Sequence, residues 1–205
     1  MSKQQKEQSE QVTIPAIEVV EMLVTLVGDS PLIVHAWDQK TLQGMLDKQQ
    51  QKPKQQKGPR DPHQEYLASL YPRPEGGYGF PSTGLKKAVV AACRFVDGLP
   101  MTVARGALFI MDTLTPIEGE PQMREDVVRI GRGIAQSRFR GEFPLPWKAH
   151  VRIRYNAKAV SPGQVVNLLN SAGFGVGIGE WRPERNGSFG MFHVAEAGDK
   201  KSSRK

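Results

Sequence analysis

The clearest strand in this 205-residue sequence is the stretch KAHVRIRY, residues 148–155. Side chains alternate between the two faces of a strand, so every second residue of this stretch belongs to the same face. One face is apolar and consists of Ala149, Val151, Ile153 and Tyr155. The other face is basic and consists of Lys148, His150, Arg152 and Arg154. We therefore predict a half-buried strand whose free face carries cations.

A helix is predicted directly after this strand. Ser161 can cap its first turn, and Pro162 suits the first helical position because the proline ring fixes φ near its helical value. The buried side of this helix is expected to consist of Val165, Val166, Leu168, Leu169 and Ala172. Gly173 is predicted to end the helix as a C′ glycine, and residues 189–194 predict a final strand.

Three earlier elements complete the pattern. Residues 17–27 predict a first strand whose buried side is formed by Val20, Met22, Val24 and Leu26. Ser82 or Thr83 can cap a helix that Gly98-Leu99-Pro100 ends, with an apolar side made of Leu85, Ala88, Val89, Ala92 and Phe95. Residues 101–111 predict a second strand. The resulting order, β-α-β-β-α-β, predicts an α+β domain with a ferredoxin-like core.

The chain is predicted to form one domain, residues 14–195, because 205 residues suffice for a single hydrophobic core. Residues 1–13 are rich in Gln, Lys and Glu, and residues 196–205 end in a basic run, so both are expected to be flexible tails. Residues 47–62 (DKQQQKPKQQKGPRDP) have the composition of a mobile, solvated insertion.

Several classes of protein are excluded by the composition. No apolar run approaches the roughly 20 residues of a membrane span, and the first residues lack the apolar core of a signal peptide, so a cytoplasmic protein is expected. Cys93, the only cysteine, is expected to be a buried apolar residue. The histidines show no metal-ligand spacing with one another or with Cys93. We therefore predict no metal, no cofactor and no catalytic residue.

Positive charge is concentrated in one part of the sequence. Lys and Arg number 28 against 21 Asp and Glu, and the resulting net charge of +7 favours a polyanionic partner. Residues 129–154 contain one acidic residue, Glu142, and seven basic residues: Arg129, Arg132, Arg138, Arg140, Lys148, Arg152 and Arg154. Aromatic side chains that could stack on unpaired bases are Phe139, Phe143, Trp147 and Trp181. The alternative interpretation is a solvated polar face, with these aromatic residues in the core.

A glycine-rich run, residues 173–179, follows the second predicted helix and precedes two arginines. Glycine lets a phosphate approach the backbone closely, so candidate nucleic-acid contacts are Gly177, Gly179, Arg182 and Arg185. A dinucleotide-binding fingerprint lies between a strand and a helix, whereas this run lies between a helix and a strand, which excludes a Rossmann site. The alternative is a tight turn without a ligand.

Three motifs together resemble those of the repeat-associated mysterious protein (RAMP) superfamily, in particular the guide-RNA-binding backbone subunits of CRISPR effector complexes. Residues 80–87 (FPSTGLKK) are similar to the family's apolar-Pro-Gly-Ser-Ser-Leu-Lys-Gly stretch, although the glycine that the family has after the proline is missing. Gly177-Ile178-Gly179 and Gly187-Ser188-Phe189-Gly190 are similar to its C-terminal glycine-rich loop, which is longer here. Residues 28–33 (GDSPLI) are similar to its small-residue-Pro-Leu turn.

The resemblance implies a RAMP-like, RRM-like core that binds single-stranded nucleic acid, with RNA favoured. Lys86 and Lys87 join the expected contacts, as does His150 on the basic strand. The resemblance also implies homo-oligomers along a strand, or a subunit of a larger ribonucleoprotein complex, with residues 47–62 reaching the neighbouring subunit. The pattern is similar to uncharacterised phage-encoded proteins as well, which implies a viral origin and a location in the host cytoplasm.

Two other functions stay open at this point. Some related endoribonucleases cleave RNA with a histidine, for which His35 would be the candidate here. Certain backbone subunits instead cut target RNA with a loop aspartate, for which Asp38 or Asp61 would be the candidates. The other function is that of a phage structural or inhibitor protein that acts through protein contacts without nucleic acid.

Overall fold

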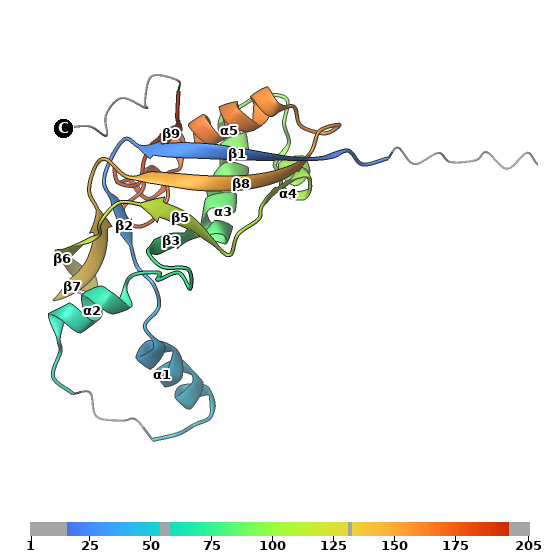
Figure 1. Cartoon of the computed structure of the whole chain (residues 1–205). Helices are drawn as coiled ribbons and strands as arrows, with labels where there is room; N and C mark the ends of the chain where they lie inside the picture. Colours follow the sequence, from blue (N-terminus) through green and yellow to red (C-terminus); the bar gives the residue numbers. More distant parts are fainter. Residues whose placement is uncertain (1–15, 54–57, 131–132, 197–205) are drawn as a thin grey trace, which may run out of the picture.

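The computed structural model describes residues 16–53, 58–130 and 133–196, and Figure 1 labels its helices and strands. In its main sheet the strand order is β3-β5-β8-β1-β9, and β4 pairs with β8 as well. The long central strands are β1 (Val19–Gly28) and β8 (Lys148–Asn156), which run antiparallel. The shorter strands are β3 (Tyr78–Pro81), β4 (Leu108–Ile110), β5 (Leu114–Glu118) and β9 (Phe192–Val194).

Two helices cover one face of this sheet, α3 (Ser82–Ala92) and α5 (Pro162–Gly175). The core between the sheet and these helices includes Leu26, Leu85, Val89, Val151, Ile153, Leu168 and Leu169. The opposite face of the sheet, in front in Figure 1, is not covered by any of the described helices. We call it the open face.

The connectivity confirms the predicted ferredoxin-like α+β fold. Along the chain the elements follow the order β1-α3-β4-β8-α5-β9, and in space β4, β8, β1 and β9 lie side by side with antiparallel pairing. The predicted alternation along β8 is confirmed, since Ala149, Val151, Ile153 and Tyr155 are buried. The predicted cap of α5 is also confirmed. The Ser161 hydroxyl accepts from the Gln164 backbone N–H at 3.3 Å, and the Gln164 side chain accepts from the Ser161 N–H at 2.8 Å.

The segment predicted as a second strand, residues 101–111, is mostly helical. Helix α4 comprises Met101–Ala107, and only Leu108–Ile110 form a strand. Ala104 and Ala107 are three residues apart and form the buried side of this helix. The prediction was wrong because two small side chains at helical spacing give a weaker apolar signal than the larger residues of Leu108–Ile110.

Four local predictions were also wrong. Ser82 lies inside α3 and does not cap it, because its hydroxyl forms a buried hydrogen bond with the Thr115 hydroxyl at 2.8 Å. Phe95 is exposed, since α3 ends at Ala92 and a 3₁₀ turn (Cys93–Phe95) follows. Gly173 lies within α5 and does not terminate it. The last strand begins at residue 192, because the preceding residues belong to the glycine-rich loop.

A second sheet, which the sequence did not predict, has the order β2-β7-β6. Its strands are β2 (Leu32–Val34), β6 (Gln122–Ile130) and β7 (Ile134–Phe143). Helix α2 (Pro62–Ala68) packs on β7, and the Ser69 hydroxyl that follows it accepts from the Gly141 N–H at 2.7 Å. Helix α1 (Gln39–Gln49) stands apart from the two sheets (Figure 1).

The predicted insertion, residues 47–62, is partly ordered into helices. Its first residues, 47–49, belong to α1, and its last residue, Pro62, begins α2. Residues 54–57 and both predicted tails, apart from Glu196, lie outside the described residues. None of the described helices is long and apolar enough to cross a membrane.

Candidate functional site

The open face carries the basic side of β8. Lys148, His150, Arg152 and Arg154 point to this face because the residues between them are buried beneath α3 and α5. About half of each of the Arg152 and Arg154 side chains is exposed. The structure therefore brings four of the predicted contacts together on one surface.

Both arginines of the open face have acidic partners that lie far away in the sequence. Arg152 Nη2 donates to Asp112 Oδ1 at 2.7 Å, and Arg154 Nε donates to Glu21 Oε1 at 2.8 Å. The predicted excess of positive charge was counted within residues 129–154 and therefore omitted Glu21 and Asp112. The positive charge of the open face is smaller than predicted. Exposed ion pairs of this kind contribute only about 0–1 kcal/mol, so the arginines can exchange partners.

His150 is held on the same face by two contacts. Its Nδ1 lies 3.3 Å from the Thr25 hydroxyl, and its Nε2 lies 3.4 Å from Glu118 Oε2. The two partners stand on the strands on either side of β8, so the imidazole is fixed between β1 and β5.

Exposed apolar side chains stand beside the arginines of the open face. Leu23 is 72% exposed and lies opposite Arg152, and Phe109 is 46% exposed and lies opposite Arg154. Exposed apolar side chains that gather on one surface mark binding sites for partners. Phe109 was not among the predicted contacts, because its place within the apolar run Leu108–Ile110 indicates burial.

Lys86 and Arg154 flank Phe109 at the edge of the sheet. Lys86 Nζ lies 3.9 Å from the centre of the Phe109 ring. Burial, followed by the nearby charge of Arg105, lowers the pKa of Lys86. With Lys86, Arg152 and Arg154 this edge holds three cations against the two acids Glu21 and Asp112. We call the surface formed by Leu23, Lys86, Phe109, Arg152 and Arg154 the Phe109 surface.

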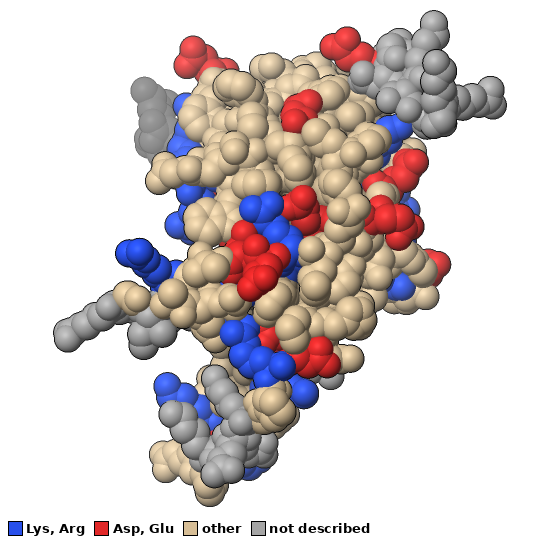
Figure 2. All heavy atoms as spheres, turned by 90° about the vertical axis from the view of Figure 1, so that its left-hand side faces the viewer, with Lys and Arg blue, Asp and Glu red and all other residues tan. Residues whose placement is uncertain are grey.

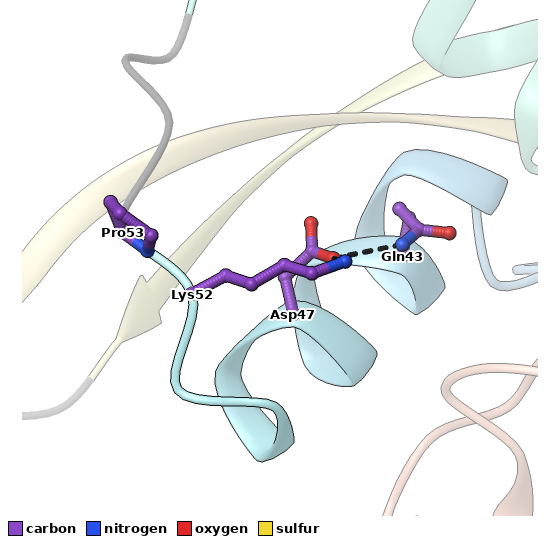
Figure 3. A pocket seen from close by; sticks show the side chains of 4 residues that line it. All are labelled: Gln43, Asp47, Lys52 and Pro53. Carbon is purple, nitrogen blue, oxygen red and sulfur yellow. Dashed lines mark hydrogen bonds and ion pairs between the residues drawn. The ribbon is translucent and has the colours of Figure 1, made fainter.

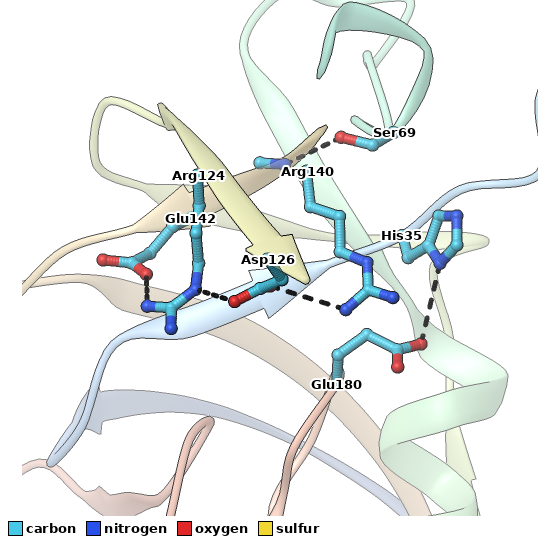
Figure 4. Close-up of polar contacts among 8 residues, drawn as sticks. His35, Ser69, Arg124, Asp126, Arg140, Glu142 and Glu180 are labelled. Carbon is cyan, nitrogen blue, oxygen red and sulfur yellow. Dashed lines mark hydrogen bonds and ion pairs between the residues drawn. The ribbon is translucent and has the colours of Figure 1, made fainter. Parts of the chain in front are cut away.

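A second polar cluster lies on the hairpin formed by β6 and β7 (Figure 4). Arg124 bridges two acids, donating from Nε to Asp126 at 2.8 Å and from Nη1 to Glu142 at 2.6 Å. Arg140 is only 7% exposed, and its Nη1 lies 3.6 Å from Asp126 Oδ2. Within the described residues, Arg140 Nε and Nη1 have no hydrogen-bond partner. Arg140 is therefore a buried member of a charge network and not part of an exposed basic surface.

His35 and Glu180 approach Arg140 from the other side of this cluster (Figure 4). His35 follows β2, and its Nδ1 lies 4.0 Å from Glu180 Oε1. Burial, followed by the charge of Arg140, lowers the pKa of His35, and Glu180 opposes this shift. His35 therefore favours its neutral form in the folded protein.

The remaining predicted cations of the hairpin are divided between its faces. Arg138 lies opposite Asp126 in the β6–β7 register and so shares the face of Arg140. Arg129 is exposed on the other face, and Arg132 lies outside the described residues. Figure 2 views the molecule from the side of this hairpin, where basic and acidic side chains are interleaved. The hairpin therefore does not present a uniform basic surface.

The charge of the whole described part is close to zero. The residues outside it include nine Lys or Arg and three Asp or Glu, so 28 − 9 = 19 cations and 21 − 3 = 18 acids remain. The described residues thus carry +1 of the net charge of +7. Most of the excess positive charge belongs to segments outside the described residues.

The glycines of the loop after α5 are required by close backbone packing. Gly177 and Gly179 have φ values of +69° and +76°. A Cβ at Gly179 would lie 2.3 Å from the Ile33 carbonyl oxygen, and the next residue, Glu180, donates its N–H to the same oxygen at 2.9 Å. The loop is thus a tight turn anchored on β2.

The segment after these glycines forms a shallow hollow of about 360 Å³ lined by Glu180, Trp181, Arg182 and Arg185. Arg182 is engaged within the loop, donating from Nη1 to the Gly179 carbonyl at 3.0 Å and from Nη2 to Glu184 at 2.9 Å. Arg185 is exposed. Sequence reasoning missed Glu180, since nothing in the glycine pattern indicates that an acid enters this site.

The aromatic residues proposed for base stacking differ in their burial. Phe143 and Trp147 are buried in the core, and the Trp147 Nε1–H donates to the Ser30 carbonyl at 2.8 Å. Phe139 is partly buried, and Trp181 is 44% exposed. The core interpretation is therefore correct for Phe143 and Trp147, and Trp181 stays available for stacking.

The two aspartates considered for RNA cleavage cap helices. Asp38 accepts from the Lys40 N–H at 3.2 Å, and Asp61 accepts from the N–H groups of His63 and Gln64 at 2.9 and 3.2 Å. Both carboxylates thus have local structural roles. Cys93 is buried as predicted, and burial raises the pKa of its thiol.

A further hollow, of about 440 Å³, lies at the end of α1 (Figure 3). Asp47 Oδ1 accepts there from Gln43 Nε2 at 2.9 Å and from Lys52 Nζ at 3.4 Å. Pro53 completes the lining, so all its residues come from one local segment. These contacts complete the helix end, and the lining contains no aromatic residue.

No protein-family model matches this chain, and no curated protein matches it in sequence. Among solved structures, the fold is similar to the crystal structure of Cmr6 from Pyrococcus furiosus, with 10% sequence identity and a TM-score of 0.44. The match covers 88% of this chain and 100% of Cmr6. A similarity of this degree assigns neither a family nor a function, so the RAMP membership that the sequence motifs predict stays a prediction.

Proposed function

We propose that this protein binds single-stranded nucleic acid, with RNA favoured, on the Phe109 surface of the open face. The observation that carries the proposal is the half-exposed Phe109 ring, which lies opposite Arg154 on the open face and is contacted by Lys86, whose side chain reaches the ring from α3. An aromatic ring can stack on an unpaired base, and the surrounding cations can contact the phosphates on either side of that base.

Acidic residues reduce the affinity expected of this surface. Glu21 and Asp112 already pair with Arg154 and Arg152, so a phosphate must compete with a carboxylate for each guanidinium. A bidentate arginine-phosphate contact is a strong charge-assisted hydrogen bond, whereas the exposed carboxylate pair contributes only about 0–1 kcal/mol. The exchange therefore favours the phosphate.

The other predicted contacts do not belong to the Phe109 surface. Lys148 and His150 continue its face along β8, and the rest stay predictions: Lys87, Arg129, Arg132, Arg138, Arg140, Gly177, Gly179, Arg182 and Arg185. Oligomers along a strand and a place in a larger ribonucleoprotein complex likewise stay predictions.

The proposal is tested by measuring fluorescence anisotropy with a short labelled oligouridine. Phe109→Ala should weaken binding by about 5- to 150-fold, the range that corresponds to one lost base-aromatic stack. Phe95→Ala is the matched control, because Phe95 is an exposed phenylalanine in the helical layer and lies 58% open to solvent. Equal affinities of Phe109→Ala and the wild type would refute this use of the open face.

The ion pair between Arg154 and Glu21 allows both a loss and a gain of binding affinity to be tested. Arg154→Ala removes a phosphate contact and should weaken binding, whereas Glu21→Gln frees the guanidinium and should strengthen it. Arg94→Ala is the control for arginine removal, since Arg94 is similarly exposed and pairs with Glu184. If Glu21→Gln weakened binding as much as Arg154→Ala, the pair would act only in folding.

Size-exclusion chromatography with and without nuclease separates nucleic-acid binding from the competing structural or inhibitor role. A nucleic-acid binder should elute with a component that absorbs at 260 nm and that nuclease removes. An unchanged elution profile without such a component would favour a function through protein contacts.

A further inference from the structure

The loop hollow next to the hairpin has the size and the wall of a small binding site. Its volume of about 360 Å³ lies within the roughly 300–1,000 Å³ of small-ligand sites. Trp181 forms one wall with 44% of its surface exposed. Its backbone is fixed in an uncommon left-handed conformation, with φ at +53°, and its carbonyl accepts from the Phe189 N–H at 3.1 Å. The loop therefore holds a large aromatic ring partly open to solvent.

Two polar groups of the hollow are available for a ligand. Arg182 is occupied by the Gly179 carbonyl and by Glu184. Arg185, by contrast, has no ion-pair partner among the described residues and is exposed. The Glu180 carboxylate is nearly half exposed and lies 4.0 Å from His35, on the side where Arg140 also approaches (Figure 4), while its backbone is anchored to β2. The hollow thus combines an aromatic ring, a donor fork and a carboxylate.

This combination selects the chemistry of the ligand. Glu180 would repel a phosphate, so the site is poorly suited to the nucleic-acid backbone. A guanine base presents two acceptors, O6 and N7, to an arginine, and presents adjacent N–H donors, at N1 and N2, to a carboxylate. Adenine and uracil lack this pair of adjacent donors.

We propose that this hollow binds one unstacked guanine base of a bound strand. The base lies on the Trp181 ring, Arg185 donates to O6 and N7, and Glu180 accepts from N1–H and N2–H. This assignment rests on the proposed function and extends it. Stacking and phosphate contacts bind a strand of any sequence, whereas the hollow would select one base at one position.

The first test uses free mononucleotides and calorimetry on the full chain. GMP should bind, IMP, which lacks the 2-amino group, should bind about tenfold more weakly, and AMP should bind more weakly still. Equal affinities for GMP, IMP and AMP would overturn the proposal. Glu180→Gln should remove the difference between GMP and IMP, because an amide cannot accept from both N–H groups.

The second test places the base in a strand and adds a matched tryptophan control. A short oligouridine with a single central guanosine should bind more tightly than the same strand with inosine there. Trp181→Ala should abolish this difference, whereas Trp37→Ala should leave it intact, since Trp37 is also exposed but precedes α1. If the affinity of the strand did not depend on its central guanosine, the hollow would not bind a guanine base within a strand, even if it bound free GMP.

The outcomes of these two tests distinguish a failure of the guanine site from a failure of the proposed function. If oligouridine binds but neither GMP nor the guanosine strand is preferred, the guanine site is wrong and the Phe109 surface stands. If GMP binds with the expected order of affinities and oligouridine does not, the Phe109 surface is wrong.

Discussion

Arg140 and Arg154 are separated by only 14 positions, yet their surroundings give them different roles. Arg140 is almost fully buried beside Asp126, so its charge serves the contact between the hairpin and the loop after α5. Arg154 is exposed and pairs with a carboxylate that is itself exposed. Removing one partner of a buried charge pair is costly, whereas an exposed pair exchanges freely. Only Arg154 can therefore take part in binding a polyanion without disrupting the fold.

His35 gives a prediction at this scale about the dependence of stability on pH. Burial and Arg140 hold the pKa of His35 below its ordinary value of 6.5. On lowering the pH, the unfolded chain takes up this proton before the folded protein does, so stability should fall as the pH drops below about 6.5. His35→Gln should reduce this loss, as measured by urea unfolding between about pH 7 and pH 5.

The same unfolding series with His63→Gln provides the control, because His63 is exposed near the start of α2. This variant should follow the wild type. Parallel losses of stability in His35→Gln and the wild type would show that other groups cause the acid sensitivity.

Among the elements, β8 and α5 define the domain because each has a clear signal of its own. The alternation of β8 separates a core face from an open face, and the Ser161-Gln164 capping box fixes where α5 begins. Helix α5 then meets β9 at a point where no side chain fits. A Cβ at Gly173 would lie 1.7 Å from the Phe192 carbonyl oxygen.

This contact predicts that Gly173→Ala destabilises the fold. The new methyl group would force α5 and β9 apart, and overpacking of this kind costs about 1–3 kcal/mol in the free energy of unfolding. Gly163→Ala in the same helix is the matched control. It has open space around its Cβ position and should be neutral or more stable, by up to about 1 kcal/mol. Urea unfolding measures both, and a Gly173→Ala protein as stable as Gly163→Ala would contradict the close packing.

The whole molecule combines a nearly neutral described part with a strongly basic sequence. The described residues carry +1, so within the described part phosphate binding on the open face depends on a few local cations. The β6–β7 hairpin and the glycine-rich loop form a second region, in which acids and bases are interleaved (Figures 2 and 4).

This distribution of charge predicts how binding responds to salt. Each phosphate contact of a single strand contributes about −0.7 to the slope of log K against log salt concentration. The three cations Lys86, Arg152 and Arg154 lie near Phe109, so the slope for oligouridine should be no steeper than about −2. Anisotropy titrations over a range of salt concentrations measure it, and a much steeper slope would mean that cations elsewhere bind most of the strand.

Much of the ferredoxin-like order could be predicted because its signals are local. The faces of β1 and β8 and the cap of α5 are readable from period-two alternation and from Ser161-Pro162. The place of β2 in the second sheet could not be predicted, because the residues that pair in β2 and β7 are more than 100 positions apart. The β6–β7 hairpin of the same sheet is local and was missed. Of the candidate site, the sequence identified Lys86, Arg152 and Arg154 but missed Phe109.

By itself, the sequence determined which side chains share a face within each strand or helix, since backbone geometry fixes these periods wherever the element forms. It also determined the total charge. Only the tertiary structure decided that Glu21 and Asp112 neutralise Arg154 and Arg152, that Arg140 is buried, and that Phe109 stays exposed. The physical reason is that ion pairing and burial depend on distance in space, and strand pairing brings together residues as far apart in the chain as Leu26 and Val194.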